Sequence, residues 1–202
     1  MRMLDVEGFI LVGGASSRMQ RDKSRLLLNG KTTVARIVGE LNAVAGIIAT
    51  VGSREAGAFP LPNIPDVYER WGPLGGIHAA LASARAEWCV LVACDLPFVT
   101  ADLFRRLLAL RQEAVPDAIV PLQSDGIPQP LCALYRTATC LQLARQAIAA
   151  GAHSPRALLD QVATRYVEFQ TLADLPRAAH FFFNVNTPEN FAEAQVIAAQ
   201  ID

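Results

Sequence analysis

Residues 88–95 read Trp-Cys-Val-Leu-Val-Ala-Cys-Asp, an unbroken apolar run that ends at a carboxylate. Short apolar runs of this length are typical of strands that are buried on both faces of a parallel sheet. A second run, Gly8 to Val12, stops at the pair Gly13-Gly14, and a third occupies residues 47–51. These runs predict three buried strands, two of which end at residues with obvious chemical uses.

Helical patterns alternate with the strand patterns along the rest of the chain. Further strands are predicted at residues 118–122, 131–135, 166–169 and 181–185, and helices at 34–44, 77–86, 103–110, 141–148, 155–162 and 188–199. This alternation predicts a three-layer α/β/α fold with a mostly parallel sheet. Neither a repeat nor a long linker divides the sequence, so residues 1–202 are expected to form one domain.

The composition excludes several classes of protein. Half of the residues are apolar and the net charge is −1, which argues against disorder and against a basic nucleic-acid-binding surface. The four cysteines show no C-x-x-C spacing, so we expect free buried thiols and no zinc site. Neither a signal peptide nor a bilayer-spanning stretch is apparent, and we therefore expect a cytoplasmic protein without membrane or nucleic-acid partners.

The loop after the first strand has the composition of an anion site. Its two glycines let backbone N–H groups approach a ligand, and Ser16, Ser17, Arg18, Arg21 and Lys23 add donors and positive charge. This chemistry suits a triphosphate, although neither the G-x-G-x-x-G fingerprint nor the P-loop spacing is present. The alternative is a surface loop whose charges are solvated.

Two aspartates follow predicted strands. Asp95 ends the strongest strand, and ligands of open α/β sheets bind outside the carboxyl ends of the strands. A carboxylate there could hold Mg²⁺, which takes oxygen ligands and bridges to phosphates. Asp95 could instead make an Asx turn or cap the next helix. Asp66 lies in the loop Ile64-Pro65-Asp66, where a turn role is equally compatible with the sequence.

Two more loops precede helices. Residues 72–76, Gly-Pro-Leu-Gly-Gly, lead into the helix expected near Ile77, either as a ligand-facing turn or as close packing against the sheet. Thr187 and Pro188 have the residue types of an N-cap and a first helical position. Asn184 and Asn186 alternate along the predicted strand before them, so both amides could orient a ligand, unless they only make a turn.

Taken together, these segments resemble the molybdenum cofactor guanylyltransferases. The family signature L-A-G-G-x-S-x-R-M-G-x-D-K is matched by Leu11-Val12-Gly13-Gly14, Ser17-Arg18-Met19 and Asp22-Lys23. Later family motifs follow in the same order: Gly72 to Gly76, Cys94-Asp95-Leu96-Pro97, Gln129-Pro130-Leu131 and Asn184 to Glu189. The resemblance extends from Gly8 to Phe191, with Val12 and Gln20 as departures from the signature.

The resemblance implies a nucleotide-diphospho-sugar-transferase-like (Rossmann-like) fold and a set of site residues. It implies GTP binding by Leu11, Val12, Gly13, Gly14, Lys23, Val51, Asp66 and Asp95, with Mg²⁺ on Asp95. It assigns catalysis to Arg18, Lys23 and Asp95, and contact with the molybdopterin acceptor or the metal to Asn184 and Asn186. Relatives carry an asparagine near the end of the second strand, where this chain has Val51-Gly52-Ser53.

The implied activity is a Mg²⁺-dependent transfer of GMP from GTP to molybdopterin, with release of pyrophosphate. Molybdoenzymes or their chaperones are possible recipients of the product. Two alternatives stay open at this point: a cytidylyltransferase of the same cofactor, and a non-catalytic GTP-binding adaptor that delivers the cofactor. An adaptor would not need Asp95.

Overall fold

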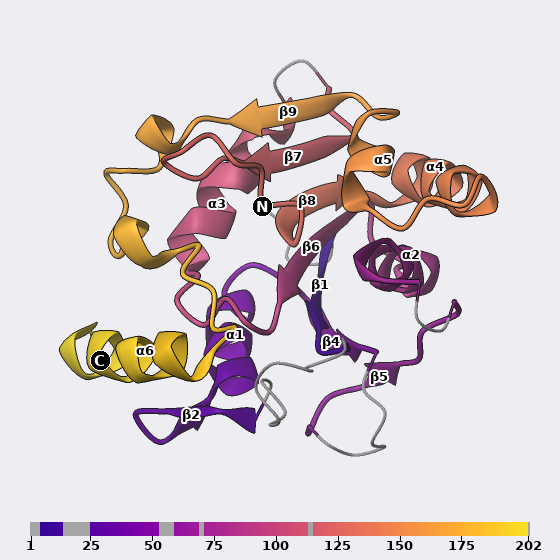
Figure 1. Ribbon diagram of the computed structural model, residues 1–202. Coiled ribbons are helices and arrows are strands. Elements are labelled where there is room, and N and C mark those ends of the chain that lie inside the picture. Colours follow the sequence, from indigo (N-terminus) through magenta and orange to yellow (C-terminus); the bar gives the residue numbers. More distant parts are fainter. Residues whose placement is uncertain (1–4, 14–24, 53–58, 69–70, 113–114, 202) are drawn as a thin grey trace.

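The computed structural model describes residues 5–13, 25–52, 59–68, 71–112 and 115–201. Within this part of the chain a seven-stranded sheet crosses the middle of the molecule, with helices on both faces (Figure 1). In sheet order the strands are β5 (Asn63–Ile64), β4 (Ile47–Val51), β1 (Val6–Leu11), β6 (Trp88–Ala93), β8 (Cys132–Arg136), β7 (Ala118–Pro121) and β9 (Thr164–Val167).

Strand β8 alone runs against its neighbours in this sheet. It pairs antiparallel with both β6 and β7, whereas β5, β4, β1 and β6 are mutually parallel and β9 is parallel to β7. The prediction of a mostly parallel sheet is confirmed. The reversal of β8 was not predicted, and its cause is the short connection from β7, because a parallel return needs a crossover of a dozen or more residues.

Alternate residues of β6 face opposite layers of the molecule. Trp88, Val90 and Val92 belong to a buried cluster with α1 (Thr33–Leu41) and α3 (Ala101–Ala109). Cys89 and Leu91 belong to a second cluster with α2 (Pro73–Ser83), α4 (Thr137–Ala149) and α5 (Pro155–Leu159). Since successive side chains of a strand point to opposite faces, β6 is buried on both sides, and the predicted three-layer arrangement is confirmed.

A smaller unit lies beside these layers. A hairpin of β2 (Leu27–Leu28) and β3 (Lys31–Thr32) contacts α6 (Pro188–Ile201), and the two share a third buried cluster that includes Val185. Thr187 accepts a hydrogen bond from the N–H of Asn190 at 3.2 Å, so the predicted cap of this helix is confirmed. Three short 3-10 helices complete the described fold: η3 (Leu110–Gln112), η4 (Phe169–Thr171) and η5 (Ala178–His180).

Two predicted boundaries are wrong. Residues 181–185 form no strand: the N–H of Phe183 closes a turn onto His180 at 3.0 Å, and Phe181 is buried by loop packing and not by a sheet. Helix α2 begins at Pro73 and not near Ile77, because Pro73 is a favourable first helical residue, and Gly75 and Gly76 lie inside the first turns. In the described part of the chain, no helix is long and apolar enough to cross a membrane.

Candidate active site

The carboxyl ends of β1 and β4 are joined through one carbonyl group. The N–H groups of Val12 and Gly13 both donate to the carbonyl oxygen of Val51, at 2.9 and 3.3 Å. The side chain of Val51 is buried, so any contact it makes with a ligand at this edge must use its backbone. The structure thus brings together Leu11, Val12, Gly13 and Val51, four of the residues predicted to bind the nucleotide.

The backbones of Gly13 and Gly52 are in close contact at this edge. A Cβ added to Gly13 would lie 2.9 Å from the carbonyl oxygen of Gly52, and one added to Gly52 would lie 3.0 Å from the Cα of Gly13. Gly52 also has a φ of +82°, which L side chains rarely adopt. Only backbone therefore fits between the segments that follow β1 and β4. Because no side chains stand there, the peptide groups are within reach of a ligand.

Asp66 lies against the same glycine pair. Its Oδ2 atom would be 3.1 Å from a Cβ at Gly52, and the N–H of Gly52 donates to the carbonyl of Ile64 at 2.9 Å. The short strand β5, which the sequence analysis missed within a predicted loop, holds the chain in this register beside β4. Asp66 is half-buried, and its carboxylate is thereby fixed beside the backbone of Gly13 and Gly52.

The amino end of α2 packs over the end of β1. Gly72 precedes the helix with a φ of +72°, and a Cβ at Gly76 would lie 3.4 Å from the Leu11 side chain. Gly76 therefore serves close helix–sheet packing, one of the two interpretations left open by the sequence. The motif still borders the candidate nucleotide site, because Leu11 is part of that edge.

Trp71, which lies two residues before α2, is held by a distant part of the chain, a role that was not predicted from the sequence. Its indole N–H donates to the carbonyl of Ala152 at 2.6 Å, and its ring stacks on His153 with centroids 4.3 Å apart. The N–H of Leu74 also donates to the carbonyl of His153 at 3.4 Å. The turn between α4 and α5 thus holds Trp71 and the start of α2, and no local sequence pattern indicates such a contact between distant segments.

His78 is a buried side chain of α2. Both of its ring nitrogens are shielded from solvent without a hydrogen-bond partner among the described residues, and its ring meets the Tyr68 ring edge-on at 5.0 Å. Burial, assisted by the positive charge of Arg145, lowers the pKa of His78 below its ordinary value.

Asp95 stands in the turn that follows β6. The N–H of Cys94 donates to the carbonyl of Leu11 at 3.0 Å, which aligns this turn with the end of β1. Asp95 is half-buried, and its Oδ1 atom is shielded from solvent. Thr100 is the N-cap of α3 and accepts from the N–H of Leu103 at 3.3 Å. The alternative that Asp95 caps this helix is therefore wrong.

The segment before α6 is tied directly to the Asp95 turn. The N–H of Val185 donates to the carbonyl of Asp95 at 2.9 Å. Val185 is fully buried, whereas Asn184 is exposed and Asn186 is half-buried. The structure therefore brings both predicted acceptor-binding asparagines to the same edge as Asp95, although they are carried by a loop and not by a strand.

Three predicted site residues, Gly14, Arg18 and Lys23, lie outside the described residues. Gly13 and Arg25 are the described residues that flank this segment, and Gly13 is at the candidate site. The roles of the three residues stay predictions.

The donor set at this edge fits Mg²⁺ better than a transition metal. No group of three or more His, Cys, Asp or Glu side chains suited to a metal gathers within the described ranges. Mg²⁺ does not require such a cage, because it is commonly held by one or two carboxylates together with substrate phosphates and water. Asp95, which follows a central strand, has the hard carboxylate oxygens that such coordination uses.

Comparison with known proteins agrees with this geometry. Residues 8–166 match the family model of the MobA-like NTP transferase domain. The chain is 35% identical to a probable molybdenum cofactor guanylyltransferase of Pelotomaculum thermopropionicum, over 97% of this chain and 95% of that protein. It is 32% identical to the molybdenum cofactor guanylyltransferase of Vibrio cholerae, over 94% and 91% of the two chains.

A solved structure supports the same assignment. The crystal structure of molybdopterin-guanine dinucleotide biosynthesis protein A from Archaeoglobus fulgidus superposes with a TM-score of 0.82 at 26% identity, and the match covers 96% of this chain and 99% of that one. The resemblance drawn from the sequence motifs is therefore confirmed, and this chain belongs to the family of MobA-like NTP transferases, which are nucleotidyltransferases.

Proposed function

We propose that this protein is a molybdenum cofactor guanylyltransferase, which transfers GMP from GTP to molybdopterin and releases pyrophosphate. The observation that carries the proposal is the meeting of two sets of residues at one sheet edge. The Gly13–Gly52 backbone pair and Asp66 lie on one side, and Asp95 lies with Val185 and its flanking asparagines on the other. The names of the relatives supply the acceptor.

The first set suits the nucleotide. Peptide groups of Gly13 and Gly52 are accessible because neither residue has a side chain to cover them. The Asp66 carboxylate, fixed beside them, has two acceptor oxygens and would pair with the adjacent N–H donors on the edge of guanine. Cytosine has a single amino donor on the corresponding edge, so this arrangement favours GTP over CTP.

The second set suits the acceptor. Asn184 and Asn186 would orient the terminal phosphate of molybdopterin for in-line attack on the α-phosphorus of GTP. A new P–O bond would form as the bond from the α-phosphorus to the bridging oxygen breaks, and pyrophosphate would leave with that electron pair. Because the attacking phosphate is already anionic, no strong general base is needed, and catalysis rests on positioning and charge neutralisation.

Charge neutralisation falls to Asp95, Arg18 and Lys23 in this proposal. Asp95 would hold Mg²⁺, which neutralises phosphate charge when it is bound. Arg18 and Lys23 would offset the charge that develops on the leaving pyrophosphate. A non-catalytic adaptor would need the nucleotide half of this site alone.

We further propose that the reaction takes place in the cytoplasm and that the product passes to molybdoenzymes or their chaperones. The support for a reducing compartment is that Cys89, Cys94, Cys132 and Cys140 are all free and buried. Fractionation of the native host, followed by immunodetection, tests the location. Recovery of the protein outside the cytoplasm would contradict it.

The test of the function has two stages. Calorimetric titration with GTP, CTP and ATP, each with Mg²⁺, is expected to show a preference for GTP. Incubation with GTP and molybdopterin should then release pyrophosphate. A preference for CTP would indicate the cytidylyl alternative, and GTP binding without pyrophosphate release would indicate the adaptor.

A further inference from the structure

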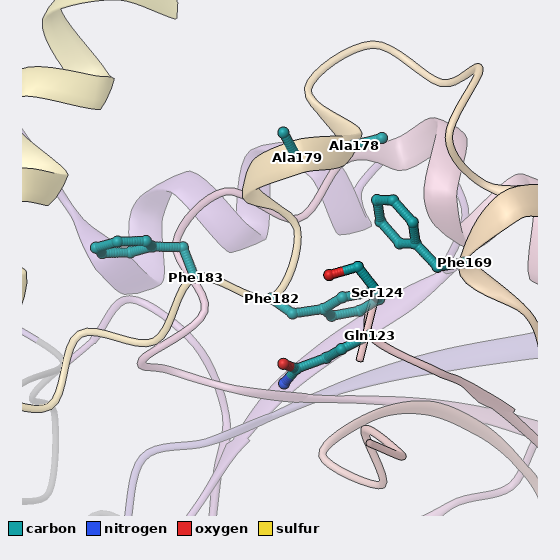
Figure 2. A pocket seen from close by; sticks show the side chains of 7 residues that line it. All are labelled: Gln123, Ser124, Phe169, Ala178, Ala179, Phe182 and Phe183. Carbon is teal, nitrogen blue, oxygen red and sulfur yellow. The ribbon is translucent and has the colours of Figure 1, made fainter. Parts of the chain in front are cut away.

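A cavity of about 350 Å³ lies beyond the carboxyl end of β7, on the acceptor side of the sheet edge (Figure 2). Gln123 and Ser124, which follow β7, line it together with Phe169 of η4. Phe182 and Phe183, from the segment before Asn184, also line it, as do two alanines of η5. The volume is at the lower end of the range for small-molecule sites, so it suits one planar ring system and not a whole dinucleotide.

The walls of this cavity are aromatic and uncharged. Phe169, Phe182 and Phe183 are only half-buried, unlike the neighbouring Phe181, which is fully buried in the core. None of the seven described lining residues carries a charge. Such walls favour stacking with a neutral planar ring and disfavour a phosphate group or a metal ion.

Two polar groups of the cavity have unused hydrogen-bonding capacity. The side chains of Gln123 and Ser124 make no hydrogen bond to another described residue. Their backbone is fixed by a tight turn, in which the N–H of Gly126 donates to the carbonyl of Gln123 at 2.9 Å. In Figure 2 the Ser124 hydroxyl lies between the rings of Phe169 and Phe182, and the Gln123 amide lies below Phe182. An amide offers two donors and one acceptor, which complements a ring edge that carries a carbonyl and an amino group.

Two of the residues that line the cavity also connect it to Asp95 and Asn184. Phe183 packs on Phe98 of the turn after Asp95, with ring centroids 6.0 Å apart. Phe182 precedes Asn184 by two residues, a separation of at most about 7 Å along an extended chain. A ligand with its ring in this cavity could therefore present a phosphate arm to Asn184 and Asp95.

We propose that this cavity binds the pterin ring of the acceptor, with Phe169 and Phe182 as aromatic walls and Gln123 on its amide edge. The inference rests on the proposed function, and it assigns recognition of the acceptor to residues outside the nucleotide half. A pterin has the required features: it is planar, neutral in its ring, and edged by a lactam and an amino group.

The test uses Gln123→Leu, which keeps the side-chain size and removes the amide. Gln146→Leu is the matched control, because Gln146 is exposed on α4 at the opposite face of the sheet. In steady-state transfer assays, Gln123→Leu should raise the KM for molybdopterin about tenfold, which corresponds to a loss of about 1.4 kcal/mol of hydrogen bonding. The KM for GTP and the kcat should stay within twofold of wild type, as should all parameters of the control.

An equilibrium measurement separates this inference from the proposed function. Fluorescence titration with 6-hydroxymethylpterin needs no turnover, and the wild-type protein and Gln146→Leu should bind this probe about tenfold more tightly than Gln123→Leu. Phe182→Ala should weaken it further through lost stacking. Equal binding by all variants, or no binding by the wild type, would overturn the inference even if GMP transfer proceeds. Absence of transfer would overturn the proposed function, and the pterin titration would still decide the role of the cavity.

Discussion

The backbone N–H of Val185 donates to the carbonyl oxygen of Asp95 over 2.9 Å, and this bond ties the turn after β6 to the loop that carries Asn184 and Asn186. Asp95 follows a central strand, whereas Val185 belongs to a loop with a buried side chain and two flanking asparagines. The bond uses only backbone atoms, so it does not itself engage the Asp95 carboxylate or the two asparagine amides. A shift of the loop would therefore move the proposed acceptor residues relative to the proposed metal ligand.

Replacement of Asp95 by Asn should abolish most of the transfer activity and leave the fold intact. The amide keeps the size of the side chain and removes the charge that would hold Mg²⁺, so turnover should fall about 100-fold or more. Pyrophosphate release measures turnover, and thermal unfolding checks the fold. Asp160→Asn on the exposed end of α5 is the matched control and should retain full activity. Turnover near the wild-type rate would remove Asp95 from the mechanism.

Replacement of Lys23 by Ala tests the segment that lies outside the described residues. If this side chain offsets charge on the departing pyrophosphate, turnover should fall roughly 100-fold or more, the effect of losing one preorganised charge-stabilising donor. Lys31→Ala in the exposed β3 serves as the matched control. Activity of the Lys23 variant within a factor of two of wild type would contradict its catalytic role.

Replacement of Gly52 by Ala should both destabilise the protein and weaken GTP binding. The new Cβ would have to adopt a φ of +82° and would lie 3.0 Å from the Cα of Gly13, at an expected cost of about 1–3 kcal/mol in the free energy of unfolding. Urea unfolding measures this loss. Gly39→Ala is the opposite control: it lies inside α1 with open space around it, and should gain about 0.5–1 kcal/mol.

His78 should make the protein sensitive to acid. Because burial lowers the pKa of His78, the unfolded chain takes up a proton near pH 6.5 that the folded chain still excludes. Stability should therefore fall as the pH drops from about 6.5 towards the lowered pKa, by up to about 1.4 kcal/mol per pH unit. Urea midpoints from pH 7.5 to 5 should decline less in His78→Leu than in wild type. Parallel declines in the two proteins would show that His78 does not cause the loss.

Three cysteines should resist alkylation in the native protein. Burial raises the pKa values of the Cys89, Cys132 and Cys140 thiols to about 12 in each case. At pH 8 the fraction of reactive thiolate is then about 10³-fold lower than for an ordinary thiol. Iodoacetamide labelling followed by mass spectrometry should modify these residues only after denaturation. Rapid native labelling at any of the three would contradict their buried environment.

The layers of the fold could be predicted because most strands are buried on both faces. In runs such as Val90-Leu91-Val92, alternate side chains pack against opposite helical layers. Every residue of such a run is therefore apolar, which can be recognised in the sequence. The direction of β8 and the short strand β5 were missed, since both depend on pairing with distant strands. Residues 181–185 were predicted as a strand because a buried aromatic loop has the same composition as a buried strand.

The candidate site was only partly visible in the sequence. Gly13 and Asp95 follow predicted strands and could be found by position, because open α/β sheets bind ligands at that edge, whereas Asp66 follows β5, which was missed, and was implied by the family resemblance. The contact of Gly13 with Gly52 and the anchoring of Trp71 by Ala152 required the folded chain. Gln123 and Phe182 could not be identified from the sequence. Their proposed role depends on the fold, which brings the amide and the phenyl ring to one cavity.

The central position of β1 has a consequence for biosynthesis. Its partner β4 follows after one helix, but β6 is synthesised much later, and the bond from Val185 to Asp95 later still. During translation the edge of β1 that later pairs with β6 is therefore unpaired until β6 has been synthesised. An unpaired apolar strand edge is prone to aggregation or to binding by a chaperone. A ribosome-bound chain ending after β6 would already contain the residues of the nucleotide half, while the acceptor half would be completed only near the end of synthesis.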